Sequence, residues 1–328
     1  MKAYVIERAG GPEVLTLTDV PSPRATGDEV TIRVRAFGIN RAEIYRRSGR
    51  MGPIERLVVP GIEAVGEVLT DPSGTLPPGR RVATAMGGMQ FSRPGSYAEQ
   101  VAVLRSNVID LGDTTLSWEE LAALPESYLT VWGALSRSLG LSKGQTLLVR
   151  GGTTSLGLAA TVYAKSLGAT VVATTRAEAN RQRLLDVGAD IVVVDGGQIE
   201  AEVRRAFPSG VDGALEVVGA TSLRDTIKTL KPFGAVAVVG LLGGPPVLET
   251  FHLMQDLPSA TRLSFFPSGL FGTPALPLTD TPLPVIARGI SEGRIPSLRV
   301  RTFDFDDVRR AHELMESDRV HGKLVVRV

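Results

Sequence analysis

The sequence predicts an α/β protein built around a doubly wound parallel sheet, with antiparallel β structure before it. Three observations lead to this fold class. Strand-like and helix-like segments alternate from Thr146 to about Phe266, and a glycine turn joins the first of these strands to the first helix. Residues 1–108 instead form short alternating apolar segments broken by Gly and Pro, a pattern typical of antiparallel sheets.

Length and composition indicate a globular chain of two domains. The chain has 328 residues, 43% of them hydrophobic and 22% charged. A net charge of +1 favours neither nucleic acid nor an acidic membrane as a partner, and the absence of cysteine excludes disulfides and cysteine-ligated zinc. The longest apolar run, Ala235 to Leu242, is too short to cross a bilayer, and the chain begins without the apolar segment of a signal peptide. We therefore expect a cytoplasmic protein with no membrane partner, and the composition does not favour nucleic acid as a partner.

Secondary structure is expected to change character along the chain. In Glu29–Arg35 every second residue is apolar, as in a strand with one buried face. From Leu116 to Leu139 the apolar residues recur at helical spacing, with a break at Pro125. The central strands are expected near 147–149, 170–175, 190–195, 213–219 and 234–240, with helices ending near 187, 207 and 230, and the tail is expected to form helices at 283–292 and 306–317 and a strand at 323–328.

The glycine turn indicates a site for a nucleotide phosphate. Gly152-x-Thr154-x-x-Gly157 matches the dinucleotide fingerprint, with threonine in place of its middle glycine. Gly152 is expected to make the tight turn, and Gly157 to let helix and strand approach. Free N–H groups at the helix start would bind a pyrophosphate, and Thr153, Thr154 and Ser155 supply hydroxyl donors or the N-cap.

The end of the next strand predicts a preference for NADPH over NADH. About 20 residues beyond the glycine turn, an enzyme that uses NAD presents an acid to the ribose 2′-hydroxyl. This strand ends instead in Thr175-Arg176, so no carboxylate at its tip repels a 2′-phosphate. Arg176 offers a charge-assisted contact, with Thr175 as a hydroxyl donor and Arg181 in reserve.

Several motifs in fixed order resemble the medium-chain dehydrogenase/reductase superfamily, and within it the zinc-independent quinone-oxidoreductase-like group. The resemblance implies a Rossmann domain at 123–266, inserted into a GroES-like β-barrel catalytic domain formed by 1–122 and 267–328, with a nicotinamide in the cleft. The motifs are Phe37-Gly-Ile-Asn40, Pro60-Gly-Ile-Glu-Ala-Val-Gly66, Pro78-Gly-Arg-Arg-Val82, Gly95-Ser-Tyr-Ala-Glu99, Tyr128-Leu-Thr-Val-Trp132, the glycine turn and Gly322-Lys323.

Within that resemblance, the zinc ligands are replaced. Zinc alcohol dehydrogenases of the superfamily have a cysteine where this chain has Asn40 and a histidine where it has Ile62, and neither an amide nor an alkyl group completes a Cys/His site. We expect no metal, and His312 and His321 are expected to be surface or packing residues. Without zinc to polarise a carbonyl, the expected substrates are conjugated acceptors, that is, quinones or α,β-unsaturated carbonyls.

The resemblance also proposes the site residues. Asn40 and Tyr45 are the catalytic candidates, although Tyr45 is equally well explained as a packing aromatic. The tyrosine that many relatives have after this loop is Met51 here, which leaves the proton donor open. Relatives pair through the last strands of the Rossmann sheet, which predicts a homodimer through Arg262–Phe266. The residues expected to contact NADPH are Asn40, Thr130, Gly152, Thr153, Thr154, Ser155, Leu156, Gly157, Thr175, Arg176, Gly219, Gly240 and Leu241.

Two alternative functions remain open at the level of the sequence. Thr153-x-Ser155-x-Gly157 is one residue from the nucleophile elbow Gly-x-Ser-x-Gly, which would make Ser155 the nucleophile of a hydrolase, but no histidine precedes His252. Relatives with structural or RNA-binding roles suggest a non-enzymatic NADPH-binding protein. Its basic loop would contain Arg46, Arg47, Arg50 and Arg56, and such a run is more often a solvated face.

Overall fold

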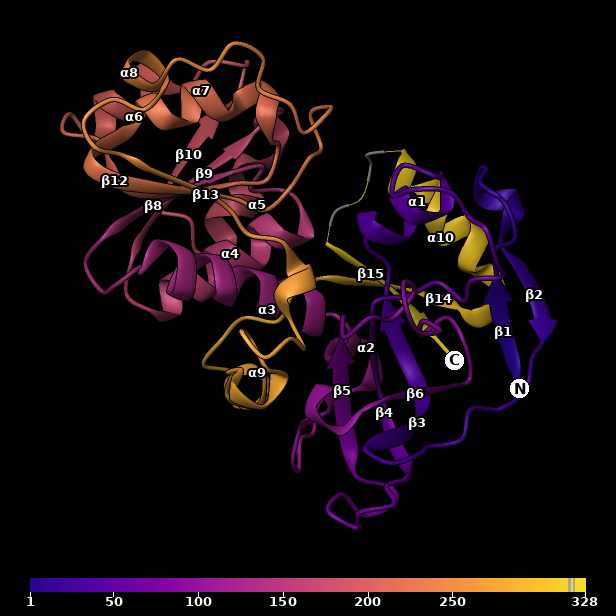
Figure 1. Cartoon of the computed structure of the whole chain (residues 1–328). Helices are drawn as coiled ribbons and strands as arrows, with labels where there is room; N and C mark the ends of the chain where they lie inside the picture. The colour runs from indigo at the N-terminus through magenta and orange to yellow at the C-terminus, as the bar shows by residue number, and fades with distance from the viewer. Residues whose placement is uncertain (318–319, 321) are drawn as a thin grey trace. The chain divides into compact units, whose positions relative to one another are not determined.

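The computed structural model describes residues 1–317, 320 and 322–328, which form two compact units. The first unit consists of residues 1–129 together with 268–328, and the second of residues 130–267. Both ends of the chain therefore belong to the first unit, as the indigo and yellow segments of Figure 1 show. The divisions expected from the sequence were after residues 122 and 266.

The first unit is organised around a mixed sheet that joins the N-terminal and C-terminal parts of the chain. The terminal strand β15 pairs antiparallel with β3, with Val326 opposite Phe37, and β14 pairs parallel with β15 at the edge. Within the described residues the strand order is β14-β15-β3-β4-β5-β7, with β6 also paired to β3. The strands are β1 (Lys2–Val5), β2 (Thr16–Asp19), β3 (Glu29–Gly38), β4 (Glu63–Thr70), β5 (Arg81–Ala85), β6 (Gln100–Leu104), β7 (Ile109–Asp110), β14 (Val300–Asp304) and β15 (Lys323–Arg327).

Alternation in β3 places its apolar side chains in the core, as the sequence predicts. Val30 and Ile32 are fully buried and contact the cluster that also contains Leu324 and Val326 of β15. The expected break at Pro125 is confirmed, because one helix ends at Ala122 and the next begins at Pro125. The helices of this part of the chain are α1 (Arg41–Arg47), α2 (Trp118–Ala122), α3 (Pro125–Trp132), α9 (Leu283–Ser291) and α10 (Val308–Glu316), and a π-helical segment (Gly133–Leu139) continues α3.

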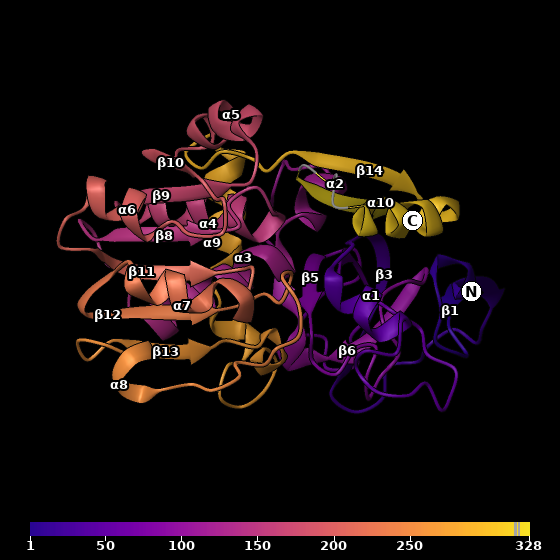
Figure 2. The ribbon, with the colours of Figure 1, turned by 90° about the horizontal axis from the view of Figure 1, so that it is seen from above.

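The second unit contains the predicted parallel sheet, in the order β10-β9-β8-β11-β12-β13. The chain starts at β8 in the middle, moves outward to β10, and returns to β11 on the other side of β8, so the strand order reverses between β8 and β11. Figure 2 shows these arrows pointing the same way. The elements are β8 (Thr146–Arg150), α4 (Ser155–Ser166), β9 (Thr170–Thr175), α5 (Arg181–Asp186), β10 (Ile191–Val194), α6 (Glu200–Ala206), β11 (Val211–Glu216), α7 (Ala220–Lys228), β12 (Leu230–Val238), α8 (Leu253–Asp256) and β13 (Arg262–Phe265).

None of the helices in the described part of the chain is long and apolar enough to cross a membrane.

Candidate functional site

The glycine turn follows β8 directly, and its sharp bend lies one residue earlier than expected. Gly151 has the left-handed backbone, with φ of 89°, whereas the sequence assigned the tight turn to Gly152. Gly152 instead lies against the neighbouring strand. Its N–H donates to the Thr174 carbonyl at 3.0 Å, and a Cβ at this position would lie 2.9 Å from the same oxygen. Of these two consecutive glycines, Gly151 therefore makes the bend, and Gly152 allows the close approach to the neighbouring strand.

Thr154 is the N-cap of helix α4 and closes the turn onto it. Its hydroxyl accepts the Gly157 N–H at 2.9 Å and donates to the Gly151 carbonyl at 2.8 Å. Gly157 lets the helix approach the turn, as predicted, because a Cβ there would lie 2.3 Å from the Gly151 oxygen. Among the described residues, the N–H groups of Ser155 and Leu156 have no acceptor. These two donors at the positive end of a twelve-residue helix fit a phosphate group.

Three side chains at the end of β9 were expected to contact the 2′-phosphate, and only one of them has donors that are not already used within the described part of the protein. Arg176 is exposed and makes no hydrogen bond or ion pair within the described residues. The Thr175 hydroxyl donates to the Ala177 carbonyl at 3.1 Å inside the turn. Arg181 forms an ion pair with Glu178 and donates to the Val192 carbonyl at 2.6 Å. The local structure therefore leaves Arg176 as the group that fits a 2′-phosphate.

The remaining predicted contacts of the second unit lie where β11 and β12 end. Gly219 has φ of 106°, and a Cβ there would lie 2.8 Å from the Gly240 carbonyl. Gly240 approaches Val217 even more closely, because a Cβ at this position would lie 2.1 Å from the Val217 oxygen. Leu241 follows directly. Thus the structure brings the glycine turn, Arg176 and these residues to the same carboxyl edge of one parallel sheet, where nucleotides bind in this fold class.

In the first unit, Asn40 belongs to a buried polar cluster that sequence reasoning did not foresee. Asn40 is the N-cap of α1, and its side-chain Oδ1 accepts from Lys323 Nζ at 2.6 Å while its Nδ2 donates to Glu63 Oε1 at 2.8 Å. Lys323 also donates to Glu63 Oε1 at 2.7 Å, and both side chains are fully buried. The only sequence signal for this pair was that both residues occur in motifs of the family.

Two further carboxylic acids flank the ion pair. Glu43 is fully buried and accepts the Asn40 N–H at 2.7 Å and the Ile62 N–H at 3.1 Å. Glu126 donates its backbone N–H to Glu63 Oε2 at 2.8 Å. Burial, and then the charge of Glu63, raise the pKa of Glu43 to about 7 and the pKa of Glu126 to about 8. Near neutral pH, therefore, Glu126 retains its proton beside the ion pair of Glu63 with Lys323.

This cluster does not fit a zinc ion. The Asn40 oxygen already accepts from an ammonium group, the alkyl side chain of Ile62 is fully buried, and the chain contains no cysteine. Elsewhere in the described part of the chain, no group of three His, Asp or Glu residues is placed to hold a metal ion. His312 is a packing residue rather than a surface one, since it is fully buried and its Nε2 lies 3.0 Å from the Tyr97 hydroxyl oxygen. His321 lies outside the described residues.

The remaining candidates of the first unit surround α1. Tyr45 is half-buried, with the Arg50 guanidinium 5.6 Å from its ring centroid. The expectation of a solvated basic loop is wrong for two of its four arginines. Arg46 is buried and donates to backbone carbonyls, and Arg47 is fully buried and pairs with Glu316 at 2.6 Å. A charged group that is satisfied inside the protein does not contact phosphates of a nucleic acid.

Two predicted residues of the second unit, Thr130 and Ser155, bear on the alternatives. Thr130 is buried in α3. Ser155 is the first residue of α4, and no described histidine forms a hydrogen bond with it. The histidine that a serine nucleophile requires is therefore not provided by the described residues, and the hydrolase alternative gains no support.

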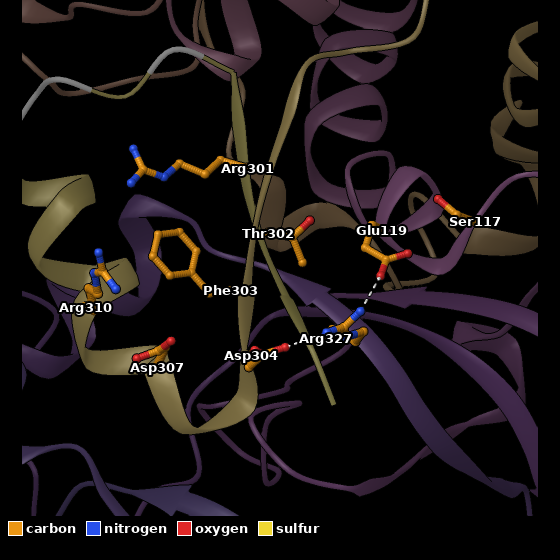
Figure 3. A pocket seen from close by; sticks show the side chains of 9 residues that line it. All are labelled: Ser117, Glu119, Arg301, Thr302, Phe303, Asp304, Asp307, Arg310 and Arg327. Atoms are coloured by element: carbon orange, nitrogen blue, oxygen red, sulfur yellow. Dashed lines mark hydrogen bonds and ion pairs between the residues drawn. The ribbon is translucent and has the colours of Figure 1, made fainter.

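A polar cavity of about 600 Å³ in the first unit contains none of the predicted site residues. Figure 3 shows Arg327 between Glu119 and Asp304, with ion pairs at 3.8 and 2.7 Å. Of its charged lining residues, Glu119, Asp304 and Arg327 are thus paired with one another. The lining residues are Ser117, Glu119, Arg301, Thr302, Phe303, Asp304, Asp307, Arg310 and Arg327.

Comparison with known proteins gives matches along most of the chain. Residues 26–113 match the family described as alcohol dehydrogenase GroES-like domain, and residues 155–270 match the family described as zinc-binding dehydrogenase. Mouse (Mus musculus) quinone oxidoreductase is 31% identical over 342 residues, which cover 98% of this chain and 95% of that protein.

Two solved structures are similar to this chain along its whole length. A mycobacterial protein in complex with NADPH is 26% identical, with a TM-score of 0.83 over 100% of both chains. Escherichia coli quinone oxidoreductase in complex with NADPH has a TM-score of 0.87 over 100% of both chains, and at 23% identity this likeness shows the fold alone. The chain therefore belongs to the medium-chain dehydrogenase/reductase superfamily of oxidoreductases, in its quinone-oxidoreductase-like group.

Proposed function

We propose that this protein is an NADPH-dependent, zinc-independent reductase that transfers a hydride to a quinone or an α,β-unsaturated carbonyl. The observation that carries the proposal is the cluster of Asn40, Glu63 and Lys323. Where zinc-dependent members have metal ligands, this chain has an amide held by a buried ion pair. The mouse quinone oxidoreductase and the mycobacterial NADPH complex support the substrate class and the cofactor.

The described residues fit NADPH at two places in the second unit. The N–H groups of Ser155 and Leu156, at the start of α4, would hold the pyrophosphate, with Gly151, Gly152 and Gly157 keeping the backbone close enough. Arg176 would contact the 2′-phosphate. When bound, NADPH supplies the hydride, and we propose that Thr130, Gly219, Gly240 and Leu241 also belong to its site.

Asn40 is the proposed donor to the nicotinamide ribose or to the substrate oxygen. Lys323 and Glu63 set the direction of its amide, because one of them donates to Oδ1 and the other accepts from Nδ2. The second Nδ2 hydrogen faces Glu43 Oε1 at 3.4 Å, which is long for a hydrogen bond and leaves this hydrogen for a better acceptor. A donor aimed at the oxygen of a conjugated acceptor stabilises the charge that develops there after hydride addition. Tyr45 is the proposed second polar contact.

The substrate class is tested by measuring NADPH oxidation with a panel of quinones, enones, simple ketones and aldehydes. We expect turnover of the conjugated acceptors, because their oxygen needs only hydrogen bonds, and little turnover of the simple carbonyl compounds. Faster reduction of a simple ketone than of every quinone and enone would contradict the proposal.

Removal of metal ions is expected to leave the activity unchanged. The family description includes zinc, but an amide, an alkyl group and an ammonium ion occupy the corresponding place in this chain. The measurement is the rate of quinone reduction before and after extended dialysis against a chelator, with metal content determined in parallel. Stoichiometric zinc whose loss abolishes turnover would show that the metal is required.

Arg176→Ala is expected to raise the Michaelis constant for NADPH about 10- to 150-fold and to change that for NADH little. A hydrogen bond to a charged group contributes roughly 1.5–3 kcal/mol, and NADH lacks the phosphate. Arg181→Ala is the matched control, because this nearby arginine is already committed to Glu178 and Val192. Equal changes in the Michaelis constants for both cofactors would show that Arg176 does not recognise the 2′-phosphate.

We also propose that the protein is a homodimer that pairs through the second unit. Strand β13 is the last strand of the parallel sheet, and the Phe265 side chain on it is 55% exposed. An edge strand with an exposed aromatic residue needs cover. We expect a dimer in sedimentation at micromolar concentration and a shift towards monomer in Phe265→Asp. A wild-type monomer under these conditions would rule out the dimer.

A further inference from the structure

An acidic residue lies at the strand end next to Arg176. It follows the neighbouring strand β10, so the sequence of β9 alone does not reveal it. Strands β9 and β10 are parallel neighbours, with Val194 opposite Thr175. Asp195 is the next residue, and its N–H donates to the Thr175 carbonyl at 2.7 Å. Asp195 therefore follows β10 at the level where Arg176 follows β9. A carboxylate here would be expected to attract Arg176 and to repel a 2′-phosphate.

Arg150 binds this acid with a two-point contact. Arg150 is the last residue of β8 and only 1% of its surface is exposed. Its Nε donates to Asp195 Oδ2 at 2.8 Å, and its Nη2 donates to Asp195 Oδ1 at 3.0 Å. The two parallel hydrogen bonds direct both oxygens of Asp195 towards β8, and such a pair restricts geometry as well as charge.

The rest of the guanidinium is anchored on the opposite side. Nη1 donates to Asp225 Oδ2 at 2.8 Å, to the Thr226 hydroxyl at 3.0 Å and to the Ser222 carbonyl at 2.9 Å, all of them in α7. Nη2 also donates to the Gly197 carbonyl at 3.0 Å. Every nitrogen of Arg150 thus has an acceptor, which holds the side chain in one position and prevents it from turning towards a ligand.

The electrostatics agree with this geometry. Burial acts to raise the pKa of Asp195, but hydrogen bonds from Arg150 and from the Gly197 N–H, together with the charges of Arg150 and Arg176, outweigh it and leave the pKa below its ordinary value. Asp195 is therefore ionised at neutral pH, and its charge is neutralised mainly by the guanidinium that touches it. Arg176 affects Asp195 only through the long-range charge interaction, so its N–H donors remain available for another anion.

We propose that Arg150 is a positioning residue for cofactor selection, because it holds and neutralises Asp195 and so leaves Arg176 available for the 2′-phosphate of NADPH. The inference rests on the proposed function, in that the site at the end of β9 binds NADPH. If Arg150 is lost, Asp195 is released. It can then pair with Arg176 or accept from a ribose 2′-hydroxyl, and both changes favour NADH.

The test uses two probes that differ only in the 2′-phosphate, namely 2′,5′-ADP and 5′-AMP. Their dissociation constants are measured by titration calorimetry for the wild type, Arg150→Met, Asp195→Asn and the double variant. In Arg150→Met we expect the preference for 2′,5′-ADP to fall at least tenfold, chiefly because 2′,5′-ADP binds more weakly. In the double variant, which has no acid to release at the end of β10, we expect most of that preference to return.

Each outcome has a separate meaning. A wild type that binds both probes equally would refute the NADPH preference in the proposed function. A wild type that prefers 2′,5′-ADP, combined with an Arg150→Met variant that keeps this preference, would refute only the role of Arg150. Equal weakening of both probes, or no recovery in the double variant, would assign Arg150 a purely structural role.

A milder substitution covers the case in which Arg150→Met does not fold. Arg150→Lys keeps a cation at the end of β8 but cannot donate two parallel hydrogen bonds. We expect the preference for 2′,5′-ADP to fall about threefold in Arg150→Lys and to be restored when Asp195→Asn is added. An undiminished preference in a folded Arg150→Lys variant, or a fall that Asp195→Asn does not restore, would overturn the proposal.

Discussion

Replacement of Lys323 by methionine is expected to lower the free energy of unfolding by about 3–5 kcal/mol, because it leaves the carboxylate of Glu63 buried without its counter-charge. Both side chains of this ion pair are fully buried, and the ammonium also donates to Asn40. Methionine has a similar volume, so the loss reflects charge rather than packing. Urea unfolding of the variant and the wild type at pH 7 measures the difference.

Two further variants separate the ion pair from other causes. Adding Glu63→Gln to Lys323→Met removes the unpaired charge and is expected to recover most of the lost stability. Lys165→Met is the control, since the ion pair of Lys165 with Asp190 is 36% and 38% exposed and is worth less than about 1 kcal/mol. A Lys323→Met effect no larger than that of Lys165→Met would show that Glu63 does not need its partner.

Glu126→Gln is expected to become progressively more stable relative to the wild type as the pH rises from 5 to 9, by about 4 kcal/mol in total. Burial and the charge of Glu63 raise the pKa of Glu126 from 4.5 to about 8 in the folded protein. The folded state therefore binds this proton more tightly than the unfolded state. The contribution of this proton to the free energy of unfolding is fully present below about pH 4.5 and is lost as the pH rises through about 8.

Urea unfolding of both proteins at pH 5, 7 and 9 measures this trend. Glutamine keeps the shape of the side chain but has no proton to lose, so the wild-type decline from Glu126 is absent in the variant, while the smaller decline from Glu43 remains. Ser127→Ala, at a neighbouring buried position, is the control and should shift stability by the same amount at every pH. A difference between Glu126→Gln and the wild type that does not change with pH would mean that Glu126 is ionised throughout.

The elements of the second unit were largely predictable because each depends on residues close together in the chain. The apolar run of Leu147 to Val149, the glycines after it and the helical spacing beyond Ser155 all report on local conformation and on burial of one face. The expected strands occur, with ends that differ by a few residues; the fifth, expected at 234–240, spans Leu230–Val238. Strand ends depend on pairing with neighbours, which a single segment does not specify.

The contacts at the predicted site differ in part from those expected from the sequence. The fingerprint led to the turn after β8, yet the left-handed residue is Gly151, because Gly152 is needed against Thr174 of the next strand. Arg176 was identified by the absence of an acid on its own strand. The acid on the adjacent strand, Asp195, became visible only once the order of the strands was known.

The sequence by itself determined the class of fold, the family and the replacement of the zinc ligands, because these follow from local periodicity, from motifs and from which residue types are present. Tertiary structure alone decided how charges are paired. Lys323 and Glu63 are 260 residues apart, and Arg150 and Asp195 are 45 residues apart. Electrostatic energies depend on distance in space and on burial, so the same residues are neutralised, protonated or left available for a ligand according to what the fold places beside them.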